Sequence, residues 1–335
     1  GGTAALWLAA LITQALAAAT VVPVYFLVRR THSPTTSWWT AALWPLVPAL
    51  AIFLPKSDAL LPFFGATFLW LWLAGFRRGS LGLCALAGAT FWLGMFLSLA
   101  ILPIALAAGL LTLWEAVLCS PEDRVSLRYW DWGTRIGTAA IGWGIPVLLV
   151  GLLGRLNLLS AWRWNFQNHA AFYDHDTRTY WKWLLANPIE LAFAVGAPVI
   201  LAAVIGFRKS IAAGWRRRAM GPYWCLTATW LVLWLSGKNM GEAARLWLIF
   251  MPWPVWLAAG FFAPRSDADG GRQSSTRTAA VLFLVQMAVA IGTVTRVTGF
   301  DFPNVPEGQG VSVRERLPDG PFASITPDSI RAIPR

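Results

Sequence analysis

Charged residues are scarce in this chain, and cysteine and histidine are scarcer still. Asp, Glu, Lys and Arg together make up 13% of its 335 residues, whereas an ordinary soluble domain carries roughly 25%. The three cysteines, Cys84, Cys119 and Cys225, form no CxxC pair and no Cys/His spacing typical of zinc. The sequence also lacks a P-loop, a G-x-G-x-x-G motif and a G-x-S-x-G motif. These absences argue against a soluble domain, a disulfide framework, a zinc site and the common nucleotide-binding and serine-hydrolase sites.

What the chain has instead is long apolar blocks. Hydrophobic residues make up 57% of it, and they include 22 tryptophans. A block of about 20 residues with almost no charge is long enough to cross a membrane, and Trp favours the membrane interface. The sequence therefore predicts an all-α, polytopic transmembrane helix bundle of about ten spans, at roughly residues 4–28, 37–54, 59–76, 80–97, 100–118, 136–154, 188–207, 222–236, 244–263 and 279–297.

The block at residues 80–118 is too long for one crossing, so we divide it in two near Pro103. The positive-inside rule supports the division. With it, and with the C-terminal tail left out, fifteen Lys and Arg residues share one side and seven share the other. Without it, the 77–78 and 208–218 loops would face opposite compartments. The larger set contains Arg29, Arg30, Arg77, Arg78, Arg124, Arg128, Arg135, Arg208, Lys209, Arg216, Arg217, Arg218, Arg265, Arg272 and Arg277.

The more basic side is predicted to be cytoplasmic, which places both ends of the chain outside. We expect a transmembrane helical domain over residues 1–298, with an extracytoplasmic loop at about 155–187, and a short extracytoplasmic tail over residues 299–335. The net charge of +11 is then explained by basic cytoplasmic loops. Membrane lipid, and not nucleic acid, is the expected partner, since no basic stretch interleaves with stacking aromatics outside the membrane pattern.

A turn that carries Asp58 is the first polar feature on the predicted outer side. It reads LPKSDAL over residues 54–60. An acid at the entrance of a span is costly unless it has a role or a partner. Two interpretations stay open: a solvated turn residue paired with Lys56, or a residue that contacts a substrate.

The longest outer loop, residues 155–187, gathers aromatic, amide and charged side chains. Its central stretch, residues 162–183, reads WRWNFQNHAAFYDHDTRTYWKW. Aromatic faces with amide and charged groups suit a sugar, and Arg and Lys suit a phosphate or pyrophosphate. We therefore take His169, Arg178 and Lys182 as candidate substrate-binding residues. The alternative is an interfacial amphipathic helix, with Trp and Tyr at headgroup depth and charges in water.

The same loop holds a candidate metal site. Asp174, His175 and Asp176 are consecutive, and His169 lies upstream. Carboxylate and imidazole groups are normal ligands of divalent metals. The spacing alone does not distinguish this site from the interfacial helix.

Two further outer segments precede predicted spans. Residues 187–190, NPIE, have Asn, Pro and Glu at the positions of a helix start, so we predict that this segment is structural. Residues 236–245 read SGKNMGEAAR and contain Lys238, Glu242 and Arg245. Glu242 and Arg245 have the i,i+3 spacing of a helical ion pair, but they could equally hold a ligand's phosphate and hydroxyls.

At these residues the chain resembles the polytopic glycosyltransferases of the GT-C fold, which include protein mannosyltransferases and aminoarabinose transferases. Residues 53–61 are similar to a turn of that family in which an Asp opens the next span. Residues 178–183, running through 187–188 into 196–198, look like the extracytoplasmic segment of bacterial members. Residues 241–252 resemble its late span with an acid, an Arg and then a Pro. Together these matches cover most of residues 1–265.

The resemblance implies a membrane glycosyltransferase of the plasma membrane, specifically a bacterial inner membrane. Its donor would be a polyprenyl-phosphate sugar, often with a divalent cation such as Mg²⁺ or Mn²⁺, and transfer would occur on the extracytoplasmic face. The family's catalytic Asp lies in a loop after its first span. This chain opens directly into a span without a signal peptide's charged start or cleavage site, so we expect an upstream segment and assign no catalytic residue.

Other functions remain open from the sequence. One is a transporter or flippase for a lipid-linked or small polar substrate, although such proteins place ionisable groups near the midplane on broken helices. Another is a non-catalytic membrane subunit. For the enzyme, we expect Asp58 and the Glu242–Arg245 pair to open toward one outward-facing cavity, with residues 162–182 near its rim.

Overall fold

The computed structural model of the chain describes residues 2–125, 129–175, 179–237, 239–263 and 271–297, and these residues form helices and no strand. Five helical segments in this described part are long and apolar enough to cross a membrane, or up to six if a bent pair counts as one. The five are Thr3–Val28, Ser57–Arg78, Leu99–Leu118, Trp130–Gly154 and Thr276–Val294. The all-α prediction is confirmed for these residues, while the number of about ten spans stays a prediction.

The first predicted span forms, whereas the second is broken. α1 (Gly2–Ala19) and α2 (Val21–Val28) together make the first span-length segment. The predicted span at residues 37–54 is instead α3 (Pro34–Ala42), a 3₁₀ turn (Trp44–Leu46) and α4 (Pro48–Phe53). Pro45 and Pro48 interrupt it, because proline has no N–H to continue the helical hydrogen bonds.

The next three helices, α5 (Leu61–Arg78), α6 (Leu81–Leu97) and α7 (Leu102–Leu113), pack side by side. Phe68 of α5 packs on Phe91 of α6, with ring centroids 4.8 Å apart. In α7, the Thr112 hydroxyl accepts a 2.8 Å hydrogen bond from the Trp72 indole of α5. The late part of α7 thus lies beside the late part of α5, so the two run in the same direction.

The chain reverses between α6 and α7, as the division of residues 80–118 predicts. The reversal begins at Ser98, whose hydroxyl accepts from the Ala100 amide at 3.2 Å, and continues through a 3₁₀ turn (Leu99–Ile101). Pro103 lies in the first turn of α7, where its missing N–H costs nothing. The break therefore precedes the predicted position by a few residues.

α8 (Tyr129–Gly154) packs against α6 at two close backbone approaches. A Cβ atom at Gly88 would lie 1.9 Å from the Ala139 carbonyl oxygen, and one at Gly142 would lie 2.0 Å from that of Ala85. Small residues allow membrane helices to approach this closely. None of the most apolar 18-residue window of α8 is buried, so much of this helix faces outward.

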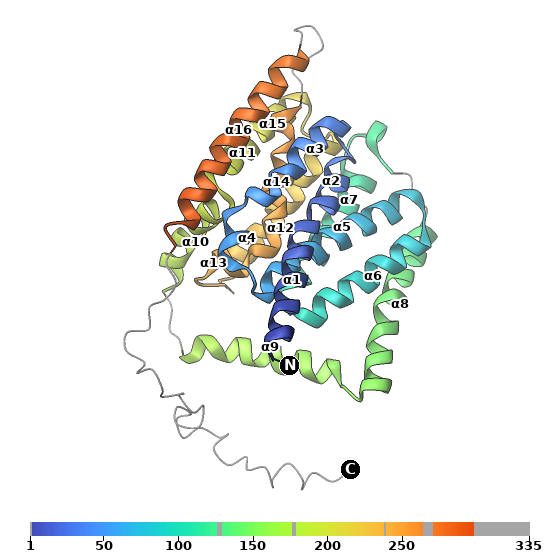
Figure 1. The fold of residues 1–335 in the computed structure, drawn as a ribbon. Helices are drawn as coiled ribbons and strands as arrows, with labels where there is room; N and C mark the ends of the chain where they lie inside the picture. The colour runs from blue at the N-terminus through green and yellow to red at the C-terminus, as the bar shows by residue number, and fades with distance from the viewer. Residues whose placement is uncertain (1, 126–128, 176–178, 238, 264–270, 298–335) are drawn as a thin grey trace, which may run out of the picture. The chain divides into compact units, whose positions relative to one another are not determined.

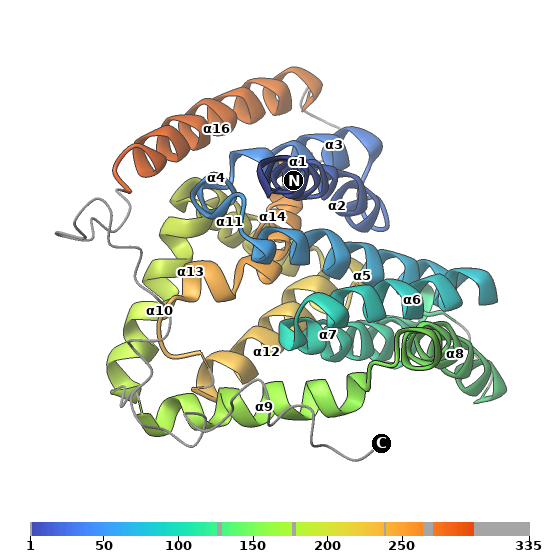
Figure 2. The ribbon, with the colours of Figure 1, turned by 60° about the horizontal axis from the view of Figure 1, so that its bottom comes forward.

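Most of residues 155–187, predicted as a loop, are helical. α9 (Leu158–His175) runs across one end of the bundle at a steep angle to α8, as Figure 1 and Figure 2 show, and α10 (Tyr180–Val195) follows. The Trp162 indole donates to the Met95 carbonyl at 3.2 Å, which attaches α9 to the end of α6. A helix lying across the ends of spans has the arrangement that the interfacial-helix interpretation predicts.

A bend of 101° separates α10 from α11 (Ala197–Ala213) and breaks the predicted span at residues 188–207. Gly196 lies at the bend with φ of +97°, and a Cβ there would meet the Gln286 side chain at 2.3 Å. The fully buried Gln286 donates from Nε2 to the carbonyls of Val195 at 3.0 Å and Leu46 at 2.9 Å. One side-chain amide thus binds carbonyls at two helix breaks.

The last helices are mostly short. α12 (Gly221–Leu235) is followed by α13 (Ala243–Leu246), a 3₁₀ turn (Leu248–Phe250), α14 (Pro252–Leu257) and α15 (Ala259–Phe262). Pro252 and Pro254 divide the predicted span at residues 244–263 into these pieces. α16 (Gly271–Val294) contains the final span-length segment.

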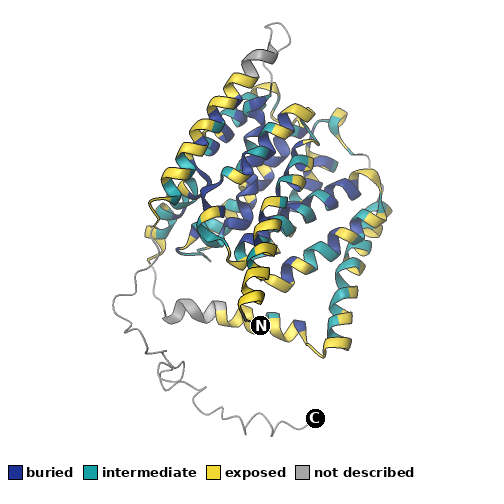
Figure 3. Ribbon diagram, viewed as in Figure 1, coloured by how far each residue is buried: buried dark blue, intermediate teal, exposed yellow. Residues whose placement is uncertain are grey.

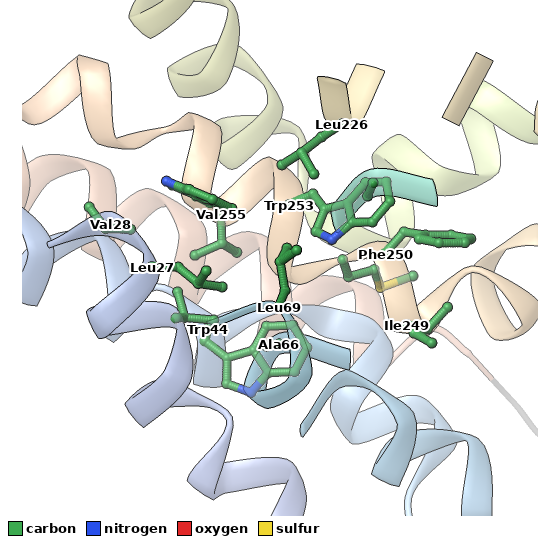
Figure 4. Packing of buried hydrophobic residues seen from close by; sticks show 14 of the residues in the cluster. Leu27, Val28, Trp44, Ala66, Leu69, Leu226, Ile249, Phe250, Trp253 and Val255 are labelled. Carbon is green, nitrogen blue, oxygen red and sulfur yellow. The ribbon is translucent and has the colours of Figure 1, made fainter. Parts of the chain in front are cut away.

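The buried core gathers side chains from α2, α5, α12 and α14, among them Leu27, Leu69, Leu226 and Val255 (Figure 4). Trp44 is fully buried, and its indole donates to a backbone carbonyl of α1 at 2.7 Å. By contrast, α1, α8 and α16 expose large apolar side chains along much of their length (Figure 3). Apolar side chains that face outward are what a lipid environment requires.

The basic loops of the predicted cytoplasmic side lie together at one end of α5. Glu115, in a π-helical turn (Trp114–Leu118), pairs with Arg30 at 2.6 Å and with Arg218 at 3.3 Å. Arg30 follows α2, and Arg218 precedes α12. These loops therefore share one side of the bundle, as the charge distribution predicts; which compartment they face stays a prediction.

Candidate functional site

A cluster of three charged side chains lies at the opposite end of α5. Asp58 is in the 3₁₀ turn (Ser57–Leu60) that leads into α5, and Arg245 is in α13. The Arg245 Nε lies 3.8 Å from Asp58 Oδ2, and its Nη2 lies 2.5 Å from Glu242 Oε2. The structure thus brings together residues 187 positions apart, as we expected for one site.

The structure does not give Asp58 the partner that the first interpretation of its turn named, and its contact with a substrate stays a prediction. Asp58 is paired with Arg245, whereas the Lys56 ammonium lies over the Phe53 ring, 5.9 Å from its centroid. About a third of each side chain of the Asp58–Arg245 pair is exposed, 30% and 32%. The cluster is therefore open enough for a ligand to reach.

The segment before Arg245 is held in place by one face of α10. Residues 180, 184, 187 and 190 follow one another at helical spacing along that face. The Tyr180 hydroxyl donates to the Leu235 carbonyl at 2.8 Å, and the Trp234 indole donates to the Leu184 carbonyl at 2.9 Å. Nearer the cluster, two further α10 side chains bind the segment at both ends of its final turn.

Those two side chains are Asn187 and Glu190. The Asn187 Nδ2 donates to the Asn239 carbonyl at 2.7 Å, and Glu190 Oε1 accepts from the Ala244 amide at 2.9 Å. We call this set of four hydrogen bonds from residues 180, 184, 187 and 190 the α10 clamp. The prediction that residues 187–190 start a helix is wrong, because α10 begins at Tyr180 and passes through Pro188. Their polar groups serve the neighbouring turn instead.

Glu242 adopts a backbone conformation that is unfavourable for its residue type. Its φ and ψ of 53° and 31° lie in the left-handed region, which costs a non-glycine residue about 1–2 kcal/mol. Its carbonyl accepts from the amides of Arg245 and Leu246 and so starts α13. The strained turn places the Glu242 and Arg245 side chains together, and residues held this way often occur at functional sites.

The other candidate residues are not brought into this cluster by the described structure. Lys182 is exposed on the first turn of α10, where its ammonium lies 5.8 Å from the centroid of the Trp181 ring. His169, Asp174 and His175 lie in α9, but their side chains are outside the described ones. Asp176, Arg178 and Lys238 are outside the described residues altogether.

The described acidic groups do not fit a divalent metal site. No group of three or more His, Cys, Asp or Glu side chains suited to a metal occurs in the part of the chain that the structure describes. At the cluster, Asp58 and Glu242 share the Arg245 guanidinium, so a cation there would first have to displace Arg245. The predicted ligands Asp174, His175 and Asp176 lie outside the described side chains, so their metal site stays a prediction.

An apolar groove of about 480 Å³ lies beside the clamp, on the inner side of the α10–α11 bend. Its walls come from α10, α11, α12 and α14 and include Leu191, Phe207, Tyr223, Trp230 and Trp253. Leu191 directly follows Glu190 of the α10 clamp. Neither this groove nor a second apolar hollow of about 560 Å³ between α2 and α3 is lined by Asp58, Glu242 or Arg245. The first groove has the polarity for a hydrocarbon chain.

Comparison with known proteins found no matching family model, no matching curated protein and no matching solved structure. The likeness to GT-C glycosyltransferases therefore stays a prediction from the quoted residues.

Two polar groups near the site were not identified as important from the sequence. Asn187 and Glu190 were assigned to a helix start because Asn-Pro-x-Glu is typical of one. The sequence also contains a different indication. Asn187 and Glu190 are polar residues at helical spacing between Trp183 and Leu191, on a helix face that is otherwise apolar. Gln286 carried the same kind of signal as the one amide in an apolar block, residues 279–291.

Proposed function

We propose that this chain binds a polyprenyl-phosphate sugar and takes part in moving the sugar to an acceptor on the extracytoplasmic face. The proposal rests on one observation above all: Arg245 is held between two carboxylates at one end of the bundle. An apolar groove lined in part by α10 is a second, separate feature that supports it. A guanidinium binds phosphate oxygens through two parallel N–H groups. A groove lined by aromatic and aliphatic side chains suits the hydrocarbon part of the same ligand.

In this proposal Arg245 exchanges part of its carboxylate pairing for the donor's phosphate. The acceptor hydroxyl oxygen forms a bond to the anomeric carbon, and the bond from that carbon to the phosphate oxygen breaks. The electron pair leaves with the lipid phosphate, and the hydroxyl proton passes to a base. Arg245 stabilises the charge that the leaving phosphate gains. Asp58 and Glu242 orient the guanidinium and contact sugar hydroxyls.

The test compares Arg245→Ala, Arg245→Lys, Glu242→Ala and the Arg245→Ala/Glu242→Ala double variant in the full chain. Binding of undecaprenyl phosphate is measured by native mass spectrometry in detergent at matched protein concentration. A lost charge-assisted contact costs about 1.5–3 kcal/mol, so Arg245→Ala should bind roughly tenfold to a hundredfold more weakly. Arg245→Lys should also be defective, because an ammonium cannot make the two-pronged contact.

A triple variant separates binding from charge compensation. If Arg245 only neutralises its two carboxylate partners, adding Asp58→Asn to the double variant leaves none of the three charges unpaired, and binding should return to the wild-type level. If Arg245 binds phosphate, the triple variant should remain as weak as Arg245→Ala. Wild-type binding by the triple variant would contradict the phosphate assignment.

A second candidate function is transport of a lipid-linked or small polar substrate, which the α10–α11 bend favours. Membrane transporters build their sites at interrupted helices, and this chain has such a break at Gly196 beside the groove. Reconstituted vesicles distinguish the two functions. Movement of undecaprenyl-phosphate glucose between leaflets without loss of its sugar would support transport, whereas transfer of the sugar to an acceptor would support the enzyme.

A further inference from the structure

Two polar side-chain atoms at the cluster are buried without a hydrogen-bond partner among the described residues. One is the Nε of Arg245, a donor whose ionic partner Asp58 Oδ2 lies at 3.8 Å, beyond hydrogen-bond distance, and the other is the Oδ1 of Asn187, an acceptor. Asn187 is 3% exposed. Leaving such groups unpaired is costly, and an orphan group in a native fold calls for an explanation, such as an absent ligand.

The orientation of the Asn187 amide follows from its neighbour. Its other polar atom faces the Asn239 carbonyl at 2.7 Å. Only the amide nitrogen can donate to a carbonyl, and the reversed orientation would place two acceptors together. The oxygen is therefore the free atom, and it needs a partner that donates a hydrogen bond.

The two orphan atoms belong to the same small region. Asn187 and Glu190 are one helical turn apart on α10, and Glu190 binds the amide of the residue just before Arg245. Residues 239–242, which precede Ala244 and Arg245, form no regular helix. A ligand that contacts both atoms would therefore lie beside this non-helical segment.

We propose that the sugar-phosphate end of the donor satisfies both atoms, with a phosphate oxygen accepting from Arg245 and a sugar hydroxyl donating to Asn187. A phosphate diester offers only acceptors, so it can satisfy Arg245 but not Asn187. A sugar hydroxyl supplies the missing donor. Asn187 is then a specificity-determining residue that distinguishes a lipid phosphate bearing a sugar from one without it. This inference rests on the proposed function.

The experiment measures the affinity of the full chain for two lipids, undecaprenyl phosphate and undecaprenyl-phosphate glucose, by native mass spectrometry. Asn187→Leu keeps a similar volume and removes both the acceptor and the donor to Asn239. It should weaken the bare lipid as much as Asn187→Asp does, and it should weaken the sugar-bearing lipid by about a further fivefold to tenfold, the effect of one neutral hydrogen bond. Binding of the bare lipid at the level of Asn187→Asp also shows that the variant is folded.

Two more variants separate ligand contact from support of the turn. Tyr180→Phe removes another hydrogen bond of the α10 clamp and should leave the preference for the sugar-bearing lipid intact. Asn187→Asp keeps an acceptor oxygen and loses the donor to Asn239, so it should weaken both lipids by the same factor. If Asn187→Leu fails to fold, Asn187→Asp still tests the inference. Loss of the preference for the sugar-bearing lipid in Asn187→Asp would overturn it.

Besides loss of the preference in Asn187→Asp, three outcomes would contradict the inference, and one more is specific to the proposed function. Asn187→Leu weakening both lipids equally, or Tyr180→Phe losing the preference, would make Asn187 a support of the turn only. A wild type that binds both lipids with equal affinity would overturn the role of Asn187 while leaving the phosphate site standing. A wild type that binds neither lipid would overturn the proposed function itself.

Discussion

Removing the Glu115 carboxylate should be among the most damaging single changes in this fold. Glu115 lies between the guanidinium groups of Arg30 and Arg218, at 2.6 and 3.3 Å, and the three side chains are only 9–11% exposed. Glu115→Gln keeps the shape of the side chain and leaves two buried cations without a counter-charge. Removing one partner of a buried pair costs about 3–5 kcal/mol.

The same end of the bundle supplies a matched control. Glu122 pairs with Arg217 at 3.5 Å, but these side chains are 75% and 54% exposed. An exposed pair contributes about 0.2–1 kcal/mol, so Glu122→Gln should change the free energy of unfolding several times less than Glu115→Gln. Both variants remove one negative charge from the same side of the protein, which leaves burial as the difference between them.

The free energy of unfolding can be measured by titrating the purified chain with SDS and following helix content by circular dichroism. Replacing all three groups together, as Arg30→Met, Glu115→Leu and Arg218→Met, should recover most of the loss, since no charge is then buried unpaired. Equal destabilisation by Glu115→Gln and Glu122→Gln would refute the reasoning, because it would mean that the Glu115 cluster is as well hydrated as a surface pair.

Two further predictions concern packing and sidedness. Gly88→Ala should separate α6 from α8 and lower the SDS midpoint, because the new Cβ meets a backbone carbonyl; Gly82→Ala in the same helix, with open space around it, should not. A cysteine introduced at Lys56 should react with an impermeant thiol reagent in intact cells, and one at Arg216 should not. The native cysteines are buried, so background labelling should be low; labelling at Arg216 from outside would contradict the predicted topology.

The grouping of segments at each end of the bundle was predictable from charge. Residues 80–118 had to reverse for the basic loops to share a side, and α6 and α7 do lie antiparallel. The expectation that Asp58 and the Glu242–Arg245 pair serve one site likewise anticipated the Asp58–Arg245 contact. Both inferences draw on long-range constraints, namely the positive-inside rule and a shared site.

The interruptions inside the helices were not predicted, because hydropathy reports length and polarity but not backbone continuity. Pro45 and Pro48 indicated a break, yet the surrounding residues are apolar enough to be read as one span. At Gly196 the bend depends on Gln286, which is 90 residues away in sequence and binds the Val195 carbonyl. The Glu115 pairing is similar, since its partners lie in loops 85 and 103 residues distant. Such contacts are set by tertiary packing, which a local pattern does not contain.

The placement of charge in the bundle bears on the choice between the proposed sugar transfer and transport. Ion-coupled transporters need ionisable groups near the midplane at their broken helices. Among the described residues, the buried charged residues are Glu115 and Arg218, and both belong to the basic end. At the Gly196 break the polar group is the neutral Gln286, which is occupied by two backbone carbonyls. The break therefore supplies the curved wall of the groove without a charge that could bind an ion, while the charges suited to a phosphate lie at the opposite end from Glu115. This distribution favours chemistry at one face of the membrane over transport through its centre.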